Sequence, residues 1–481
     1  MGAYCCSLGV SGEGSFLRPQ IVINLKESGT SRRHSTTGRT EVQHTGVRNV
    51  SSGGIMRTVT WYCGWFLGLI LLMGLVPADS FGASTRVESD TILRAFQRDT
   101  TAGEDSTVLP AYEYLQIDTG ELEDYGLSFH LYGWGRADIA DSEFFEDQTA
   151  GELLYGYVEY RRAANQYGLR LGRQHVFEGV ANETIDGLRL NGNLGDYFAL
   201  SVYGGQPVGL VSEQGRSGDS IIGGRLAHHR GSKYEIGLSY KASENDGETA
   251  EEMLGVDLAL SLPSDLRLSG YSTYNQESEG LAEQSWELRV PLGRLTLKPY
   301  YQQFSYEDYF TTGANAVNPF LLLAQSTEEL TAYGLDALYQ YNASWTFGGK
   351  LKQNDYKDLD ASQAYSLLAA WQGKGGTQYG AEVGQTAGDT AENNYTLVRV
   401  YGYSEATGGR LGMDFLSGDV VLAQYEEEIY GKDSSLFASF GGGKRFMGDA
   451  LSVKLSGDYS KDPYFDEDVR GTLTVSYNFA Q

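Results

Sequence analysis

The chain has 481 residues and is acidic, with a formal net charge of −26. This charge argues against nucleic acid as a partner, because phosphate binding needs a basic surface. Its 62 Gly and 34 Tyr beside only 9 Pro are unusual for a compact enzyme. The cysteines are Cys5, Cys6 and Cys63, so the rest of the chain has no disulfide framework, thiolate metal site or haem attachment motif, and no cofactor is expected.

The first 83 residues are predicted to contribute nothing to the folded protein. Residues 1–55 are polar and patternless, which suggests a start codon assigned too early or an unstructured extension. Residues 56–83 have the order of a secretory signal peptide: Arg57, an apolar stretch, then small residues around Ala78. A permanent membrane anchor is the alternative, although the apolar stretch is short for a helical span. We therefore expect export, with residues 84–123 forming a short periplasmic segment.

From residue 124 to 481 the sequence is dominated by a period of two. The segments "KYEIGLSYK", "EMLGVDLALSLP", "SWTFGGKLK" and "TLTVSYNF" each alternate apolar residues with small or polar ones. This pattern gives a strand with one apolar and one polar face. Segments of about ten residues with this period, separated by turn residues, are typical of transmembrane barrels.

Connection lengths support the same interpretation. Short turns such as Gly195-Asp196 and Leu292-Gly293-Arg294 alternate with longer acidic connections. The sequence therefore predicts an all-β, transmembrane, antiparallel up-and-down barrel of about 20 strands (18–22), with short periplasmic turns and long acidic external loops. A soluble sandwich or propeller is less favoured, because the chain shows neither linkers nor a propeller-type repeat. The expected external loops are 139–150, 206–216, 243–251, 306–327, 354–361, 388–393, 427–433 and 460–468.

These features resemble the single-chain, large outer-membrane β-barrel porins of Gram-negative bacteria. The ending "TLTVSYNF", with Tyr477 and Phe479, is similar to the strand that the barrel-assembly machinery recognises, although Ala480 and Gln481 follow it here. The segment "LRLGRQHVFEGVANETIDGLRL" with "YFALSVYGG" is also similar to stretches of such barrels. The resemblance implies an outer-membrane channel for passive diffusion of small hydrophilic solutes, in contact with lipid and lipopolysaccharide.

In such a barrel the row opposite the apolar residues lines the lumen. Basic residues outnumber acidic ones in this row, although the whole chain is acidic. Either these charges pair across strands, or surplus basic side chains give the pore a mild anion preference. The residues expected to line the pore are Arg136, Arg170, Arg189, Arg267, Lys298, Lys350, Arg399, Lys454, Asp257 and Glu159.

The longest external connection, 306–327, contains the apolar run Phe320, Leu321, Leu322 and Leu323. In porins a long loop of this kind folds inward and narrows the channel, so we expect it to be the constriction loop. The alternative is that this run packs against neighbouring loops.

Two other functional classes remain as alternatives. An outer-membrane barrel enzyme would need a histidine with a serine and a carboxylate, and no motif beside His130 identifies that serine. No enzyme activity is therefore expected. A barrel sheath around a multihaem cytochrome would require periplasmic or extracellular cytochromes as partners, because the chain has no haem motif of its own.

Overall fold

The computed structural model describes residues 84–99, 105–122, 125–140, 144–145, 147–162, 167–209, 218–245, 247–309, 328–405, 412–464 and 467–480. The predicted extension and signal peptide lie outside the described residues. The strands are β1 (Ser84–Asp99), β2 (Asp105–Val108), β3 (Pro110–Gly120), β4 (Gly126–Asp138), β5 (Thr149–Arg162), β6 (Tyr167–Glu178), β7 (Ala181–Leu194), β8 (Phe198–Pro207), β9 (Ser220–His229), β10 (Tyr234–Asn245), β11 (Glu248–Ser261), β12 (Arg267–Asn275), β13 (Gly280–Leu292), β14 (Leu295–Ser305), β15 (Glu329–Gln340), β16 (Trp345–Tyr356), β17 (Ser362–Gln372), β18 (Gln378–Ala387), β19 (Tyr395–Glu405), β20 (Phe415–Ile429), β21 (Lys432–Phe446), β22 (Leu451–Lys461) and β23 (Asp468–Ala480). The helical elements are α3 (Tyr306–Tyr309) and the 3-10 turns η2 (Pro263–Asp265), η3 (Lys374–Gly376) and η4 (Ala391–Asn393).

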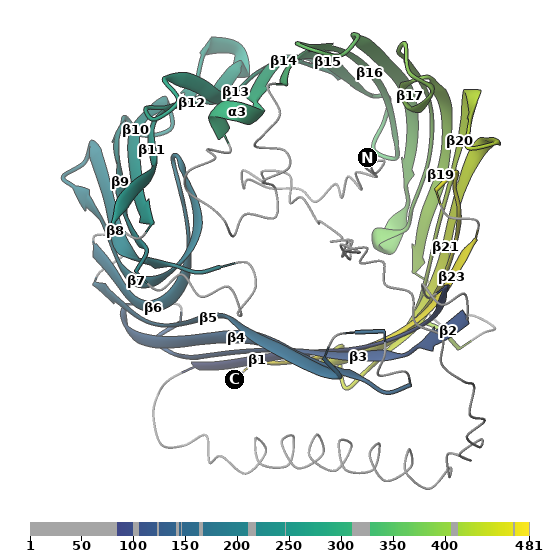
Figure 1. The fold of residues 1–481 in the computed structure, drawn as a ribbon, viewed down its shortest axis with the longest axis horizontal. Coiled ribbons are helices and arrows are strands. Elements are labelled where there is room, and N and C mark those ends of the chain that lie inside the picture. The colour runs from purple at the N-terminus through teal and green to yellow at the C-terminus, as the bar shows by residue number, and fades with distance from the viewer. Residues whose placement is uncertain are drawn as a thin grey trace, which may run out of the picture. The chain divides into compact units, whose positions relative to one another are not determined.

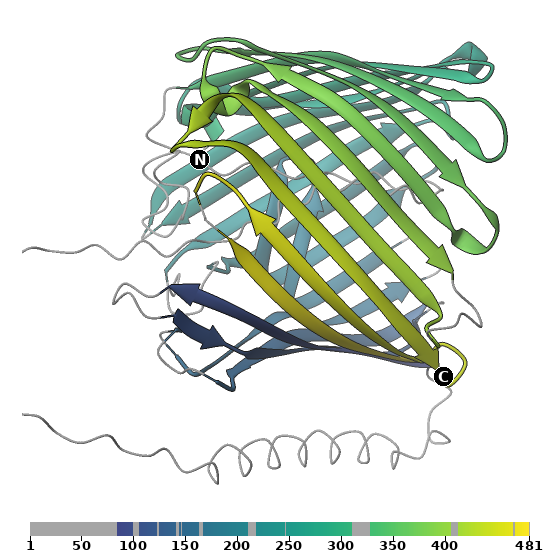
Figure 2. The same cartoon turned by 90° about the vertical axis from the view of Figure 1, so that its right-hand side faces the viewer.

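The strands form one closed antiparallel sheet (Figure 1). From β3 to β23 each strand pairs with its neighbours in the chain, and β1 pairs with both β3 and β23. The short strand β2 pairs only with the end of β1, so the ring itself has 22 strands. Figure 2 shows the strands running obliquely around the ring. Closure leaves the ring without an unpaired edge, which is the condition for spanning a membrane with strands.

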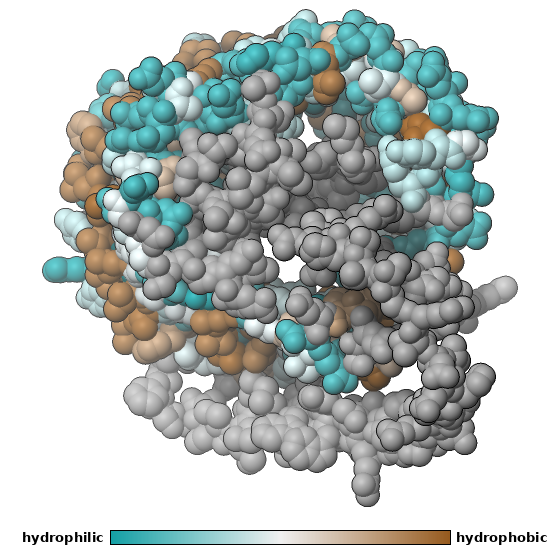
Figure 3. Space-filling model, in the orientation of Figure 1, coloured by the Kyte–Doolittle hydropathy of each residue, from teal (hydrophilic) through white to brown (hydrophobic). Residues whose placement is uncertain are grey.

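The predicted alternation determines the two faces of this sheet. Large apolar residues such as Leu238, Leu351 and Leu367 are exposed on the outer face, and apolar residues gather along the rim beside β5 to β8 in Figure 3. The described part of the chain contains no helical segment that could span a bilayer. The prediction of a large transmembrane antiparallel barrel is confirmed, at the upper end of the expected strand number.

The expectation that residues 84–123 precede the barrel was wrong, because they contain β1 and β3. The outward row of this pair carries few large apolar residues and includes Glu113. The Glu113 carboxylate accepts hydrogen bonds of 2.6 Å from both the Ser89 and the Thr91 hydroxyls. Because these polar groups hydrogen-bond to one another, they can lie on the outer face. Their presence in the outward row weakens the apolar–polar alternation by which the strands could have been predicted.

The connections divide between the two ends of the barrel as expected. The turns at Gly195, Gly293 and Ala343 lie at one end, where β1 begins and β23 ends, because Arg86 pairs with Ala480. At the other end, the prediction of long loops was wrong for two connections. Residues 243–251 and 427–433 are mostly strand, joined by tight turns at Gly247 and at Tyr430-Gly431. Charged residues continue these strands beyond the apolar band, where both faces meet water.

Candidate functional site: the lumen and its inner hairpin

The ten residues expected to line the pore all lie on the inner face of the sheet. Their strand positions alternate with the exposed apolar row; for example, Lys350 precedes the exposed Leu351. Tyr477 and Phe479 lie on the outer face, where they pair with Ser89 and Val87. A role for these two residues in assembly stays a prediction.

Many charged side chains of the inner face form ion pairs. The Arg170 Nε donates to Glu159 Oε1 at 2.9 Å, Arg189 pairs with Glu178, and Arg399 Nε donates to Asp419 Oδ1 at 3.0 Å. Sequence analysis missed Arg225, whose Nε lies 2.9 Å from Asp257 Oδ2 and whose Nη2 lies 2.7 Å from Glu235 Oε1. Of the eight basic residues expected in the pore, four form ion pairs among the described residues, so the expected basic surplus is compensated in part: Arg170, Arg189, Lys350 and Arg399.

The β6–β7 hairpin leaves the sheet and enters the lumen. Pairing of β6 with β5 stops at Arg173, and pairing of β7 with β8 stops at Ile185. Beyond these points residues 174–184, here called the inner hairpin, extend past β8 and β9. The backbone N–H of Val180 donates to Ser239 Oγ of β10 at 3.1 Å. Figure 1 shows this hairpin inside the ring, beside β10 and β11.

A lysine bridge fixes the inner hairpin to the far strands. The Lys241 Nζ of β10 lies 3.1 Å from Glu183 Oε1 of the hairpin and 2.9 Å from Glu251 Oε1 of β11. The Lys241 side chain is only 5% exposed. A buried cation is costly without partners, and the two carboxylates offset this cost for Lys241.

Apolar contacts complete the attachment. Val176, Ala181 and Ile185 of the β6–β7 hairpin form a buried cluster with Tyr203 of β8 and Ile221 of β9. This cluster fills the space between the inner hairpin and the sheet.

Glycine permits the bend that starts the inner hairpin. Gly172 has φ +125°, and a Cβ atom there would lie 2.3 Å from the Gly156 carbonyl oxygen. Its cross-strand partner Gly187 would place a Cβ 2.2 Å from the Gly204 carbonyl oxygen. Only glycine allows the backbones to approach this closely while the hairpin turns inward.

The sequence contains a signal for the inner hairpin that the analysis missed: the alternation inverts at the bend. Before the bend the outward row consists of Leu169, Leu171, Leu188 and Leu190, and beyond it the same row continues with Arg173, His175, Thr184 and Asp186. The opposite row becomes apolar, with Val176 and Ile185. Such an inversion indicates that the face that contacts lipid before the bend contacts water beyond it.

The expected constriction loop cannot be compared with this hairpin, because Phe320, Leu321, Leu322 and Leu323 lie outside the described residues. The first turn of that connection, α3, lies near the lysine bridge. Burial raises the pKa of Tyr309 in α3 to about 12, and the nearby carboxylate of Glu283 adds to the increase. The Asp308 carbonyl accepts a hydrogen bond of 2.7 Å from Asn275 Nδ2.

His130 lies in a hydrogen-bonded chain with a serine and an aspartate. Its Nδ1 is 2.7 Å from Asp118 Oδ1 and its Nε2 is 2.9 Å from Ser128 Oγ. This connectivity is that of a hydrolase triad. Ser128 is 0% exposed, however, so its hydroxyl is closed to a substrate, and Glu159 Oε2 also lies 3.6 Å from Nε2.

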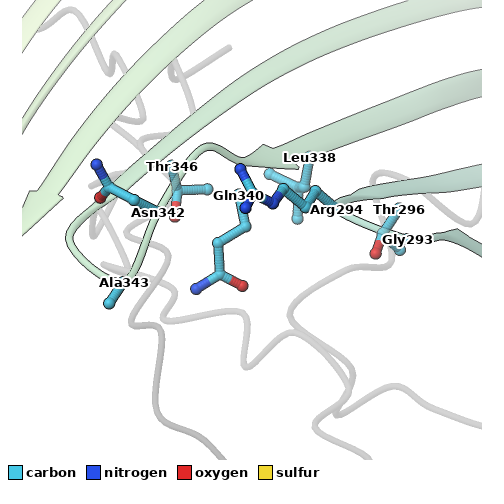
Figure 4. A pocket seen from close by; sticks show the side chains of 8 residues that line it. All are labelled: Gly293, Arg294, Thr296, Leu338, Gln340, Asn342, Ala343 and Thr346. Atoms are coloured by element: carbon cyan, nitrogen blue, oxygen red, sulfur yellow. The ribbon is translucent and has the colours of Figure 1, made fainter.

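A pocket of about 490 Å³ lies at the end of the barrel that carries the short turns (Figure 4). Residues at and beside the β13–β14 and β15–β16 turns line it, including Arg294, Thr296 and Asn342. The Arg294 Nη1 donates to the Tyr341 carbonyl at 2.9 Å, and Asn342 Oδ1 accepts from the backbone N–H groups of Ser344 and Trp345. These bonds serve the turns themselves, so the pocket is part of the barrel mouth.

No known family and no curated protein matches the chain in sequence. Among solved structures, it is similar to OccAB4 of Acinetobacter baumannii, with a TM-score of 0.43, 8% identity, and coverage of 84% of this chain and 100% of that one. OccK2 (OpdF) of Pseudomonas aeruginosa, solved with glucuronate, gives a TM-score of 0.42 and 12% identity over 83% of this chain and 98% of that one. The P pilus usher PapC translocation pore gives a TM-score of 0.45 and 10% identity, with coverage of 82% of this chain and 99% of that one. The fold assignment rests on this chain's own strand pairing.

Proposed function

We propose that this protein is an outer-membrane channel for passive diffusion of small hydrophilic solutes. The observation that carries the proposal is the closed ring with an apolar outer face and a polar, ion-paired inner face. An apolar exterior is stable against hydrocarbon, and a polar interior is stable only if it is wet. The inner hairpin occupies part of the cross-section and sets the size limit for solutes.

Reconstitution in planar bilayers tests this proposal. We expect discrete conductance steps in salt solution, and liposomes containing the protein should admit small sugars and amino acids but exclude large dextrans. A purified, folded protein that produces neither conductance nor solute flux would contradict the proposal.

The paired charges favour weak ion selectivity over a strong preference. A surplus of unpaired arginine and lysine would attract anions, whereas Glu159, Asp257 and Asp419 neutralise Arg170, Arg225 and Arg399. We therefore propose that the channel has at most a mild preference for anions. A reversal potential under a salt gradient measures it, and a clear cation preference would overturn it.

The buried position of Ser128 predicts that the triad-like chain around His130 is structural. The intact protein should not react with a fluorophosphonate probe, and Ser128→Ala should leave conductance within about twofold of the original. Covalent labelling that disappears in Ser128→Ala would instead establish a hydrolase. Co-purification of haem with the protein would favour the cytochrome-sheath alternative.

A further inference from the structure

Six aromatic side chains lie at neighbouring positions on the inner face of three adjacent strands. Tyr112 and Tyr114 belong to β3, Tyr132 and Trp134 to β4, and Tyr155 and Tyr157 to β5. They are here called the aromatic strip. All six are partly exposed, and their positions alternate with the outward row that includes Leu131.

Ring distances divide the strip into a pair and a chain of four, and the register of β3 and β4 places the pair next to the chain, because Tyr114 pairs with Trp134. Tyr112 and Trp134 have centroids 6.5 Å apart, and Tyr114 and Tyr132 are also 6.5 Å apart. Tyr132 and Tyr155 are 5.4 Å apart, and Tyr155 and Tyr157 are 5.7 Å apart. The two sets of rings together give an elongated, uneven aromatic surface within a polar lumen.

His130 stacks on Tyr157 with ring centroids 4.8 Å apart, but the strip as a whole is not explained by packing. The buried cluster inside the barrel is formed by the inner hairpin, β8 and β9, and contains none of these rings. Keeping apolar area in contact with water costs about 25 cal/mol per Å². A partly exposed aromatic strip in a wet channel is therefore expected to have a ligand that covers it.

Polar groups beside the strip restrict the chemistry of that ligand. On β1, Asp90 pairs with Tyr114, and Glu88 pairs with Gln116, one inward position beyond Tyr114. Neither carboxylate forms an ion pair within the part of the chain that the structure describes. At the two ends, Arg94 lies over Tyr112 at 5.7 Å and Arg170 over Tyr157 at 5.1 Å.

This arrangement disfavours both kinds of charged solute. An anion would be repelled by Glu88 and Asp90. Arg170 is neutralised by Glu159, but Arg94 repels a cation, and rings on one face of the sheet do not enclose a cation as an aromatic cage does. A neutral solute with an apolar face and many hydroxyl donors is compatible with both groups.

We propose that the aromatic strip binds neutral oligosaccharides on their way through the channel. The C–H face of each pyranose ring packs on an aromatic ring, and its hydroxyls donate to Glu88, Asp90 and Gln116. The strip follows the sheet over three strands, so successive sugar units bind neighbouring rings. This inference rests on the proposed channel function, because it names a class of solute for that channel.

Block of single-channel current by maltohexaose tests the proposal. The unmodified channel should be blocked reversibly, with a blocking constant that does not depend on ionic strength, because the ligand is neutral. The double variant Tyr132→Ala/Tyr155→Ala should weaken block by roughly tenfold, because two ring contacts are lost. Tyr132→Phe/Tyr155→Phe retains the rings and should remain within about threefold of the original.

Matched variants separate the strip from the rest of the lumen. Tyr401→Ala removes an inner-face tyrosine of β19 and should leave sugar block unchanged. Glu88→Gln/Asp90→Asn leaves all rings in place and should weaken block, which keeps the test informative if the alanine double variant does not fold. Equal block in all these variants would overturn the proposal.

The outcomes also separate this inference from the proposed function. Normal conductance without maltohexaose block would overturn the carbohydrate site and leave the channel intact. Block by tetraethylammonium instead would assign the strip to cations and overturn it as well. If the protein does not conduct, calorimetric titration of the detergent-solubilised protein with maltohexaose still decides whether the strip binds sugar.

Discussion

Replacing Lys241 with methionine is expected to widen the channel. Glu183 and Glu251 would then face each other without their shared cation, and removing one partner of a buried ion pair costs about 3–5 kcal/mol. The inner hairpin would lose its ion pair to β10 and β11 and retain its apolar contacts and the bond from Val180 to Ser239. Single-channel conductance should rise, with frequent transitions between levels as the hairpin detaches and returns.

Lys350→Met is the matched control. Lys350 also lies on the inner face, but its Nζ is 4.0 Å from Glu382 Oε1 and it does not contact the inner hairpin. Its conductance should remain close to that of the unmodified protein. Crosslinking Val180→Cys to Ser239→Cys in the Lys241→Met background should restore the original conductance. Unchanged conductance in Lys241→Met would show that the inner hairpin does not limit flow.

Lysine substitutions at two consecutive leucines of β17 should have very different effects on stability. Leu367 is 67% exposed on the outer face, whereas Leu368 lies on the inner face opposite Glu382. Leu367→Lys places an ammonium group against hydrocarbon, which costs about 2–4 kcal/mol near the bilayer midplane. Leu368→Lys places it in the lumen beside a carboxylate and should cost less than about 1 kcal/mol.

Reversible urea unfolding in lipid vesicles measures both variants under the same conditions. A similar loss of unfolding free energy in the two proteins would mean that the two faces of β17 meet the same environment. That result would remove the lipid-facing assignment on which the channel proposal depends.

Strand alternation made most of the barrel predictable from the sequence. The stretch from residue 125 onward was expected to hold about 20 strands, and the structure finds β4 to β23 there. Where the outward row is apolar along the whole strand, as in β10 and β11, contact with lipid requires every second residue to be apolar, and this makes the strand recognisable in the sequence. The glycine turn at Gly293, with φ 66°, was likewise recognisable.

The remaining parts were missed for physical reasons. In β1 and β3 the outward row contains polar residues that hydrogen-bond to Glu113, so the apolar–polar alternation of these strands is weak. The sequence analysis did not predict the inward course of the inner hairpin, because contacts such as Lys241 with Glu183 join residues 58 positions apart. The aromatic strip was not recognised either, because its rings come together only through the registers of β3, β4 and β5.

Cysteine accessibility along β17 tests the central claim most directly, with Cys5, Cys6 and Cys63 replaced by serine. Single cysteines at successive positions 364–369 would be treated with a membrane-impermeant thiol reagent in reconstituted vesicles. We predict reaction at 364, 366 and 368, which face the lumen, and protection at 365, 367 and 369, where labels should be quenched by a quencher in the lipid chains. Equal reaction at all six positions, or reaction confined to the odd ones, would contradict the account.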